Sequence, residues 1–338
     1  MIAPDLHISA LSFEVRAIGS ALEWLDGRSS GTLLLIDYES EATPGAEAQE
    51  LRRVVEEEIL AHTSRDIVIR KIHVTPHSMR DMIDVLTQFC VGAGTVTVDI
   101  TCMTRPHVVA AARFLAAVGV PDWAVTYSSP VNYGSTSSSS STGGWRDTLI
   151  LGLGDDTSMD NQGVSLGLMI LGAEAGRIAV AFDDFETDAG IVVVTENPDR
   201  PDFHRAALMR TQNILQYLES FSLSGSRGQT VSASLGSNGW TREIVSLPDV
   251  VGDCHAIVDR LVTAAMSVET SESKAAPIVV YPIGPKFTIF CVIYWLTSSY
   301  ADRAWCVYPI AQTHRLDYSL GLGSVHRWSS SQFQESLL

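Results

Sequence analysis

The chain has 338 residues, of which 46% are hydrophobic and 18% are charged, so two folded domains of ordinary size are within its reach. Its formal net charge is −16, with 23 Lys and Arg against 39 Asp and Glu, which argues against a polymeric nucleic acid as the partner, because phosphate backbones require clustered cations. The five cysteines are scattered without a CxxC pair, which favours reduced thiols over a disulfide framework.

The first part of the chain alternates apolar runs with stretches of helical spacing. Five runs are predicted as strands: 7–11, 31–39, 71–76, 95–101 and 123–128. This alternation is typical of βαβ crossovers and of a parallel sheet that is covered on both faces. We therefore expect a first Rossmann-like half over residues 1–133.

The next segment differs in composition. Residues 134–146 are dominated by Ser and Gly and are predicted to be a flexible linker. A strand is expected at 148–152, followed by an acidic loop with Asp155, Asp156 and Asp160. Three carboxylates could hold a divalent metal, but a solvated loop explains them as well, so we assign no metal and no cofactor.

The remainder of the chain repeats the order of the first half. Its predicted strands are 164–171, 190–198, 244–248, 277–284 and 305–309. Both halves carry, in the same order, a Glu/Arg turn, a proline turn, a turn with one cation and a strand that starts near a tryptophan. Two unrelated Rossmann-like domains would align loosely, but this shared order favours duplication.

We therefore predict an α/β fold of two tandem, duplicated Rossmann-like domains, each with a mainly parallel sheet. The second half is expected over residues 147–323, and residues 324–338 are expected to form a C-terminal tail. The most apolar helix, 287–296, is too short to span a bilayer, and the N-terminus lacks the pattern of a signal peptide. A cytoplasmic location without membrane association is the expectation.

Ligands of open parallel sheets bind outside the carboxyl ends of the strands, so the turns after the first and fourth strands are the places to search. Arg105 and Lys286 each open the helix after the fourth strand, and Thr104 and Gly284 lie in the same two turns. A cation at a helix N-terminus is unfavourable unless an anion is bound there. The alternative is a structural ion pair of Arg105 with Glu14 or Asp99.

The turn after the first strand contains Glu14 and Arg16 in one half, and Glu174 and Arg177 in the other. A carboxylate in the first turn of a helix stabilises the helix dipole, so a ligand role and a structural role both remain open. Asp99 ends an otherwise apolar strand and needs a partner there. Arg16 or Arg105 could pair with it, or it could act as an acid or base.

Other residues near these turns are weaker candidates. Tyr133 and Tyr318 close the two halves, and either could stack on a base or pack against the core. His107 follows Arg105, and His314 precedes Tyr318; each could contact a phosphate, although lone histidines are more often surface or capping residues. The GxxxxGK[ST], GxGxxG and HExxH motifs are absent, and we assign no catalytic residue.

The turn Ile283-Gly284-Pro285-Lys286, with its echo at residues 101–105, resembles the ligand turn of CRISPR-associated Rossmann-fold (CARF) sensor domains. The duplicated layout resembles the fused SAVED sensors of bacterial anti-phage systems. The resemblance implies an oligonucleotide-like ligand lying across a two-fold axis. The chain departs from the Thr-Gly-Gly-Thr-Lys pattern of that family, because Pro285 precedes the lysine.

Three functions follow as hypotheses. The first is a non-catalytic sensor or accessory subunit that binds a small nucleotide-like anion between its halves and signals to an effector protein, in an anti-phage system as the resemblance implies. The second is an enzyme that processes a nucleotide or phosphoester, with Asp99 or Glu14 as base. The third is a protein-interaction scaffold whose cations are structural.

Overall fold

The computed structural model describes residues 5–38, 46–75, 79–133, 141–154, 164–172, 175–198, 201–220, 235, 239–268, 275–314 and 319–337. The chain divides into two compact units: unit 1 is Met1–Gly144 with Ala311–Leu338, and unit 2 is Trp145–Ile310. Each unit contains a six-stranded, mainly parallel sheet with helices, so the predicted fold class is confirmed.

The sheet of unit 1 has the strand order β14-β5-β4-β1-β2-β3. Its strands are β1 (Leu6–Ala10), β2 (Gly31–Tyr38), β3 (Ile67–Val74), β4 (Val96–Asp99), β5 (Trp123–Ser128) and β14 (Val325–Ser329). The first five are parallel, and β14 pairs with β5 in the antiparallel direction. The order reverses between β1 and β4, which makes their carboxyl ends the switch point where α/β folds bind ligands.

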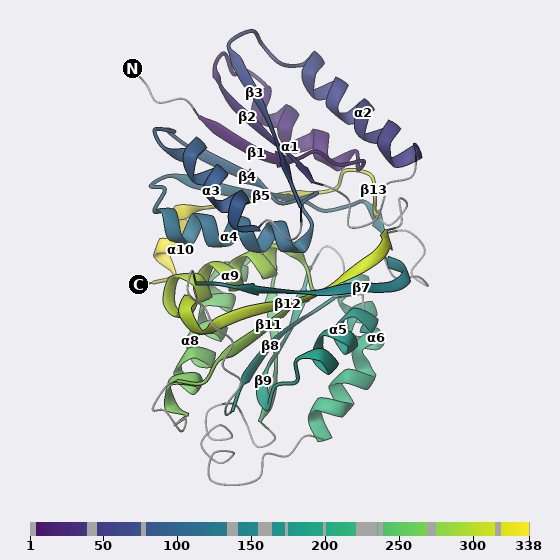
Figure 1. The fold of residues 1–338 in the computed structure, drawn as a ribbon, viewed down its shortest axis with the longest axis vertical. Helices are drawn as coiled ribbons and strands as arrows, with labels where there is room; N and C mark the ends of the chain where they lie inside the picture. The colour runs from purple at the N-terminus through teal and green to yellow at the C-terminus, as the bar shows by residue number, and fades with distance from the viewer. Residues whose placement is uncertain are drawn as a thin grey trace. The chain divides into compact units, whose positions relative to one another are not determined.

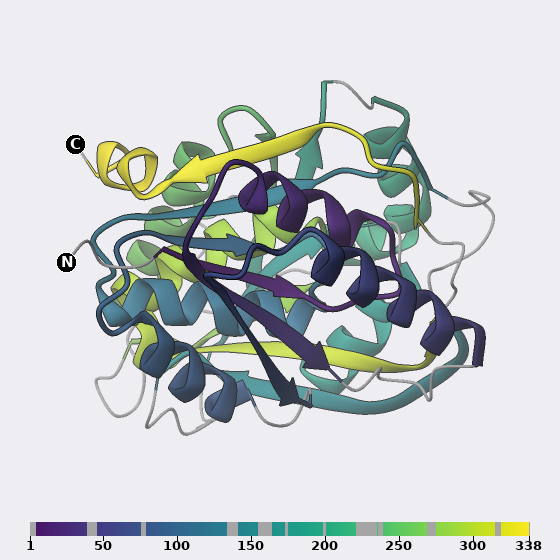
Figure 2. The same ribbon diagram turned by 90° about the horizontal axis from the view of Figure 1, so that it is seen from above.

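Helices cover both faces of this sheet. They are α1 (Arg16–Leu25), α2 (Ala46–Ala61), α3 (Met79–Cys90) and α4 (Arg105–Val118), with the short α10 (Ser330–Glu335) after β14. Helix α1 packs beside α2, as Figure 2 shows, and α3 packs beside α4. The two pairs lie on opposite faces of the sheet (Figure 1), as right-handed crossovers in this strand order require.

Unit 2 repeats this topology with the order β10-β9-β8-β11-β12-β7. Its strands are β7 (Ser141–Gly152), β8 (Leu166–Leu171), β9 (Ala189–Glu196), β10 (Trp240–Ser246), β11 (Ile278–Pro282) and β12 (Ala304–His314). Its helices are α5 (Ala175–Asp184), α6 (Pro201–Ser220), α8 (Val250–Ser267) and α9 (Lys286–Tyr300), followed by a 3-10 turn at Ala301–Arg303.

Strand pairing aligns the two units residue by residue. Leu6 of β1 lies beside Val96 of β4, and Leu166 of β8 lies beside Ile278 of β11. Val96 in turn pairs with Trp123, as Ile278 pairs with Ala304. Positions counted from these pairs are therefore equivalent in the two sheets, and we compare the units on that basis.

The boundaries of the units differ from those predicted. Residues 324–338 were expected as a tail, but β14 completes the sheet of unit 1, and the predicted second half loses 311–323 to unit 1. Strand β7 begins at Ser141, inside the predicted linker, whose residues 134–140 lie outside the described part of the chain. Strand β14 escaped sequence analysis because it is a short edge strand with exposed residues, such as Val325 at 42%.

The sequence of unit 2 is thus inserted into that of unit 1, between Gly144 and Ala311. Strand β6 (Asn132–Tyr133) pairs in the antiparallel direction with β13 (Ser319–Leu320). Next to this pair, the Gly323 amide donates to the Ser129 carbonyl at 2.8 Å, and the Ser129 amide donates to the Ser324 carbonyl at 3.0 Å. We call residues 129–133 and 319–324 the neck.

The helices of the described residues were also compared with the dimensions of a bilayer. None of them combines the length and the apolar composition that crossing a membrane requires.

Candidate functional site

Part of one buried face of the unit 1 sheet is polar, beside Leu33, Leu35 and Ala124 on the same face. Residues that pair across parallel strands point to the same side, and one such set is His7, Ser9, Thr97, Asp99 and Thr126. All five are at most 6% exposed. We call this set the polar face. Helix α1 covers it, and the Ser20 hydroxyl lies 3.1 Å from that of Thr126 and 3.5 Å from His7 Nε2.

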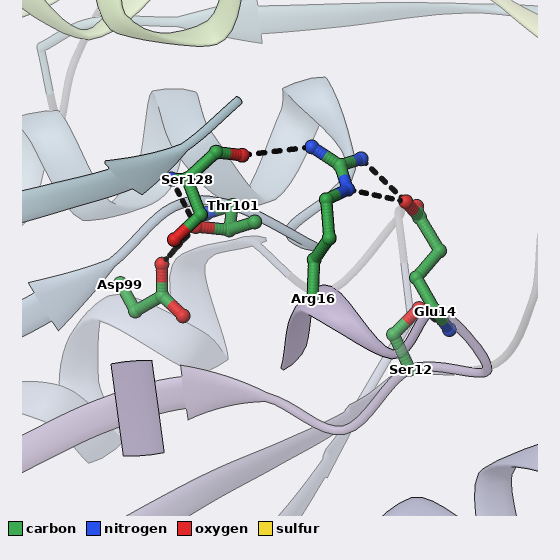
Figure 3. Close-up of polar contacts among 6 residues, drawn as sticks. All are labelled: Ser12, Glu14, Arg16, Asp99, Thr101 and Ser128. Atoms are coloured by element: carbon green, nitrogen blue, oxygen red, sulfur yellow. Dashed lines mark hydrogen bonds and ion pairs between the residues drawn. The ribbon is translucent and has the colours of Figure 1, made fainter. Parts of the chain in front are cut away.

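A cluster of polar residues continues this face at the carboxyl ends of the strands. It consists of Ser12, Glu14, Arg16, Asp99, Thr101 and Ser128, shown in Figure 3, and we call it the edge cluster. The residues come from the turn before α1, the end of β4 and the end of β5. The edge cluster therefore lies at the switch point of the unit 1 sheet.

Arg16 is the cation of the edge cluster and is only 5% exposed. Its Nη1 donates to the Ser128 carbonyl at 2.8 Å, its Nε donates to Glu14 Oε2 at 3.1 Å, and its Nη2 pairs with the same oxygen. Burial disfavours the charged guanidinium, but the Glu14 carboxylate outweighs it and raises the pKa of Arg16 above its ordinary value. Arg16 therefore stays charged and holds the turn between β1 and α1 against the end of β5 through the Ser128 carbonyl.

Asp99 is held by hydroxyl and amide donors. Its Oδ1 accepts from the Thr101 amide at 2.9 Å and from the Thr101 hydroxyl, and its Oδ2 accepts from the Ser9 hydroxyl at 3.3 Å. The Thr101 hydroxyl accepts in turn from the Ser128 amide at 2.9 Å. Of the two predicted partners, Arg16 pairs with Glu14, and a pairing with Arg105 stays a prediction. These contacts explain how a carboxylate tolerates burial.

Ser128 carries an oxygen with a different environment. Its side chain is fully buried, and within the described residues its Oγ has no hydrogen-bond partner. Figure 3 shows this oxygen directed toward the side of the cluster where Asp99 and Thr101 lie. An unsatisfied buried hydroxyl at the carboxyl end of a strand is a polar atom that calls for an explanation, and a ligand is one candidate partner.

Arg105 begins α4 as predicted, with Pro106 in the first turn and Thr104 as the N-cap. The Thr104 hydroxyl lies 2.6 Å from Nδ1 of His107, which is fully buried. His107 is therefore a buried partner of the cap rather than a surface residue. The first turn of α4 contains no acidic residue to balance the helix dipole.

In unit 2, Lys286 begins α9, whose first turn also lacks an acidic residue and whose N-cap is Pro285. Gly284 precedes both residues, and close backbone packing explains why a glycine occupies this position. A Cβ at Gly284 would lie 2.8 Å from the Leu171 carbonyl oxygen, and one at Gly172 would lie 2.6 Å from that of Ile283. The turns after β8 and β11 therefore touch backbone to backbone, and the ligand role of Gly284 stays a prediction.

Arg177 is the buried cation of unit 2. It lies on α5, is fully buried, donates from Nη1 to the Tyr308 hydroxyl, and holds its guanidinium carbon 4.8 Å from the Tyr308 ring centre. Arg16 and Arg177 thus both connect the helix after the first strand to the fifth strand of their sheet. Glu174, the predicted companion of Arg177, lies outside the described residues.

The structure accordingly brings Glu14, Arg16 and Asp99 together and places Thr104 and Arg105 in the next turn. Tyr133 lies in β6, but its side chain is not among those described. Tyr318 and the acidic residues Asp155, Asp156 and Asp160 lie outside the described residues. His314 lies in β12 with an undescribed side chain.

Sequence analysis missed two hydroxyl-bearing members of the site, Ser9 and Ser128. Hydroxyl residues fit strands without disturbing an apolar pattern, so they attract little notice. One signal was available, because Asp99 and Thr101 have the spacing at which an Asp side chain caps the backbone two residues later.

Within the described ranges, no group of three or more His, Cys, Asp or Glu side chains is arranged to hold a metal ion.

Comparisons with known proteins add little to this geometry. No family model matches the sequence. No curated protein matches it either. Among solved structures, the cytoplasmic domain of a prokaryotic cation chloride cotransporter aligns over 91% of this chain and 96% of its own, with 8% identity and a TM-score of 0.25. We base no conclusion on a likeness at that TM-score.

Proposed function

We propose that this chain is a non-catalytic sensor subunit that binds a small nucleotide-like anion at the carboxyl ends of its parallel strands. One observation carries the proposal: in both units, the first residue of the helix after the fourth strand is a cation, Arg105 in α4 and Lys286 in α9. A bound phosphate would meet the side-chain charge and the backbone amides of the same turn. The recurrence at the first residue of the corresponding helix favours a shared purpose.

The edge cluster supports the same class of ligand in unit 1. Arg16 adds a buried positive charge, and Ser128 Oγ adds a hydroxyl within the site. The contacts of Asp99 and Glu14 with Thr101, Ser9 and Arg16 assign these carboxylates to holding the site together. They favour a positioning role over service as a general base.

A sensor also requires a partner protein that responds when the ligand binds. We include a protein effector partner and a cytoplasmic setting in the proposal, as the resemblance to CARF and SAVED domains implies, with anti-phage defence as its context. Ligand binding would favour one conformation of the chain and thereby change the affinity for the effector. The sharing of one ligand by the Arg105 and Lys286 turns stays a prediction that binding stoichiometry tests.

The experiment is a calorimetric titration and thermal unfolding series with pyrophosphate, cyclic dinucleotides and short oligoadenylates. Wild type is compared with Arg105→Ala and Lys286→Ala. Exposed cations serve as matched controls: Arg53→Ala on α2, and Lys71→Ala on β3, where Lys71 pairs with Glu56 at 3.0 Å. Each removes one positive charge away from the two turns.

We expect wild type and both controls to gain stability that grows with ligand concentration, as linkage requires, and the two turn variants to lose at least tenfold in affinity. Unchanged binding in Arg105→Ala and Lys286→Ala would contradict the proposed site. No binding by any ligand would contradict the sensor and leave the scaffold. Chromatography of the bound ligand for products would expose turnover and favour the enzyme instead.

A further inference from the structure

Helix α1 packs on buried polar side chains of the sheet, which is unusual for a buried helix. Under its N-terminal half lies the polar face, contacted through Ser20, while Arg16 reaches the Ser128 carbonyl. On the other side of the same sheet, α4 buries a run of apolar residues: Val108, Val109, Ala110, Ala111, Ala112, Phe114 and Leu115. The two helices of one unit therefore differ in what holds them to the sheet.

This difference sets the cost of lifting each helix. Uncovering apolar side chains loses hydrophobic free energy in proportion to the area exposed. Uncovering hydroxyls, an imidazole and a carboxylate lets water replace the hydrogen bonds that are broken. Local opening is therefore easier where buried apolar contacts are few, and the N-terminal half of α1 is such a place.

The C-terminal half of α1 is anchored differently. Trp24 stacks on His7 with the ring centres 5.4 Å apart and is only 6% exposed. Gly31, the first residue of β2, packs directly against the indole, because a Cβ at this position would lie 2.8 Å from the Trp24 ring. The end of the helix at Trp24 and Leu25 is thus held by apolar packing, which makes it a hinge for the other end.

The neck reaches the same helix from outside. A Cβ at Gly19 would lie 3.0 Å from both terminal methyl carbons of Leu322, so the Leu322 side chain rests directly on the helix backbone. The next neck residue, Gly323, donates to the carbonyl of Ser129 at 2.8 Å. Ser129 adjoins Ser128, which accepts from Arg16. The neck therefore contacts α1 directly and also holds the strand end to which α1 is tied.

We propose that α1 is a hinged helix whose N-terminal half opens from the polar face about Trp24, and that Leu322 of the neck governs the opening. Opening would uncover Asp99, Thr101 and Ser128, while a shift of the neck would release Leu322 from Gly19. The segment that returns from unit 2 to unit 1 would then control access to the edge cluster. The proposal rests on contacts within unit 1 and does not depend on the proposed function.

The test is amide hydrogen exchange, followed by mass spectrometry, of the full chain without any ligand. We expect peptides from the N-terminal half of α1 to exchange at least tenfold faster than peptides from α4, with the part near Trp24 intermediate. Equal protection of α1 and α4 would overturn the hinged helix. Because α1 and α4 belong to one unit, global unfolding of that unit affects both alike.

A matched pair of variants tests the role of the neck. Leu322 and Val131 both lie in the neck and are 46% and 51% exposed, but only Leu322 rests on Gly19 in the contacts described. Leu322→Ala should speed exchange in α1 about threefold or more and leave α4 unchanged, whereas Val131→Ala should change neither. An α1 rate that Leu322→Ala leaves unaltered, or that rises only together with α4, would overturn the control by Leu322.

A third variant keeps the hinge testable should a neck variant fold poorly. Replacing the hydrogen-bonded pair as Ser20→Ala with Thr126→Val turns part of the interface apolar without leaving either hydroxyl unpaired. This double variant should slow exchange in the N-terminal half of α1. Unchanged or faster exchange there, with α4 as before, would show that the polar interface does not set the opening.

Discussion

The two units have the same topology but opposite interiors on one face. In unit 1 the face under α1 presents His7, Ser9, Thr97, Asp99 and Thr126. The equivalent positions of unit 2, counted along the paired strands, hold Gly167, Met169, Val279, Tyr281 and Val307. All ten positions are covered, yet one set is polar and the other is almost entirely apolar. Repetition of a fold therefore preserves the strand order while the chemistry of a face diverges.

The difference has a clear physical meaning. Unit 2 joins this face to Leu171, Ile178 and Phe182 in one hydrophobic cluster, which stabilises the unit through burial alone. Unit 1 contains buried polar groups in place of apolar ones, and Ser20 and Thr101 form hydrogen bonds with some of them. The polar face leads to the edge cluster at the switch point. We infer that unit 1 sacrifices apolar packing where a site is needed, whereas unit 2 retains it.

The most severe way to break this contrast is to place the unit 1 carboxylate in unit 2. Tyr281 occupies the position of Asp99, and Tyr281→Asp would bury a carboxylate among apolar side chains. We expect a loss of at least about 4 kcal/mol in the free energy of unfolding of unit 2. Urea unfolding followed by hydrogen exchange of β11 measures it.

Tyr281→Phe is the control for that substitution. It removes only the Tyr281 hydroxyl, which donates to the Phe185 carbonyl and lies 3.3 Å from the Thr187 hydroxyl. The loss in the free energy of unfolding should therefore be about 1 kcal/mol. Similar losses for the two substitutions would show that the apolar character of this face is not what stabilises unit 2.

The second prediction uses pH to single out unit 1. Burial, with smaller contributions from Arg28 and Arg327, lowers the pKa of His7 to about 3 from an ordinary value of 6.5. The unfolded chain therefore takes up a proton below about pH 6.5 that the folded chain refuses. Between pH 7 and pH 5 this group should cost about 2 kcal/mol of stability, and the loss should continue until the pH nears 3.

Urea unfolding at pH 7, 6 and 5 tests this for wild type and His7→Phe, which retains a ring against Trp24. The variant should lose about 2 kcal/mol less than wild type across that range. His62→Gln, at an exposed histidine directly after α2, should follow the wild-type curve. Parallel curves for wild type and His7→Phe would mean that His7 titrates alike in both states.

The mildest exchange swaps a single hydroxyl. Val307→Thr gives unit 2 the residue that unit 1 has at Thr126, with nearly the same volume. A hydroxyl among the apolar residues of unit 2 should cost about 1 kcal/mol in the free energy of unfolding. Thermal unfolding is sensitive enough to detect it. No loss would show that the unit 2 face tolerates polar groups as readily as unit 1 does.

The alternation of the strands shows why the polar face could not be foreseen. His7 and Ser9 alternate with Leu6 and Ile8, which is the pattern of a strand with one solvated face. Helix α1 covers that face instead, and its own sequence does not reveal which strands it will meet. The positions of the strands along the chain were predictable, since apolar runs and their spacing depend on local sequence. The partner of each face depends on tertiary packing.

The site was foreseen in part for a similar reason. Glu14, Arg16 and Asp99 stood out because charged residues beside apolar strands need an explanation, and the structure brings them together. Ser128 did not stand out, because a serine at the end of a strand is ordinary until its burial is known. The membership of β14 in unit 1 was likewise hidden, because only its pairing with β5 identifies it as part of the sheet.

The insertion of unit 2 into unit 1 also bears on the order in which the protein is made. A ribosome completes every strand of unit 2 by residue 314, whereas the sheet of unit 1 waits for Val325–Ser329 to emerge. During synthesis, Ser128 and its neighbours on β5 therefore border an unfilled edge while unit 2 is already able to fold. The half that carries the polar site is the last to be synthesised in full, so unit 2 can fold before that site is assembled.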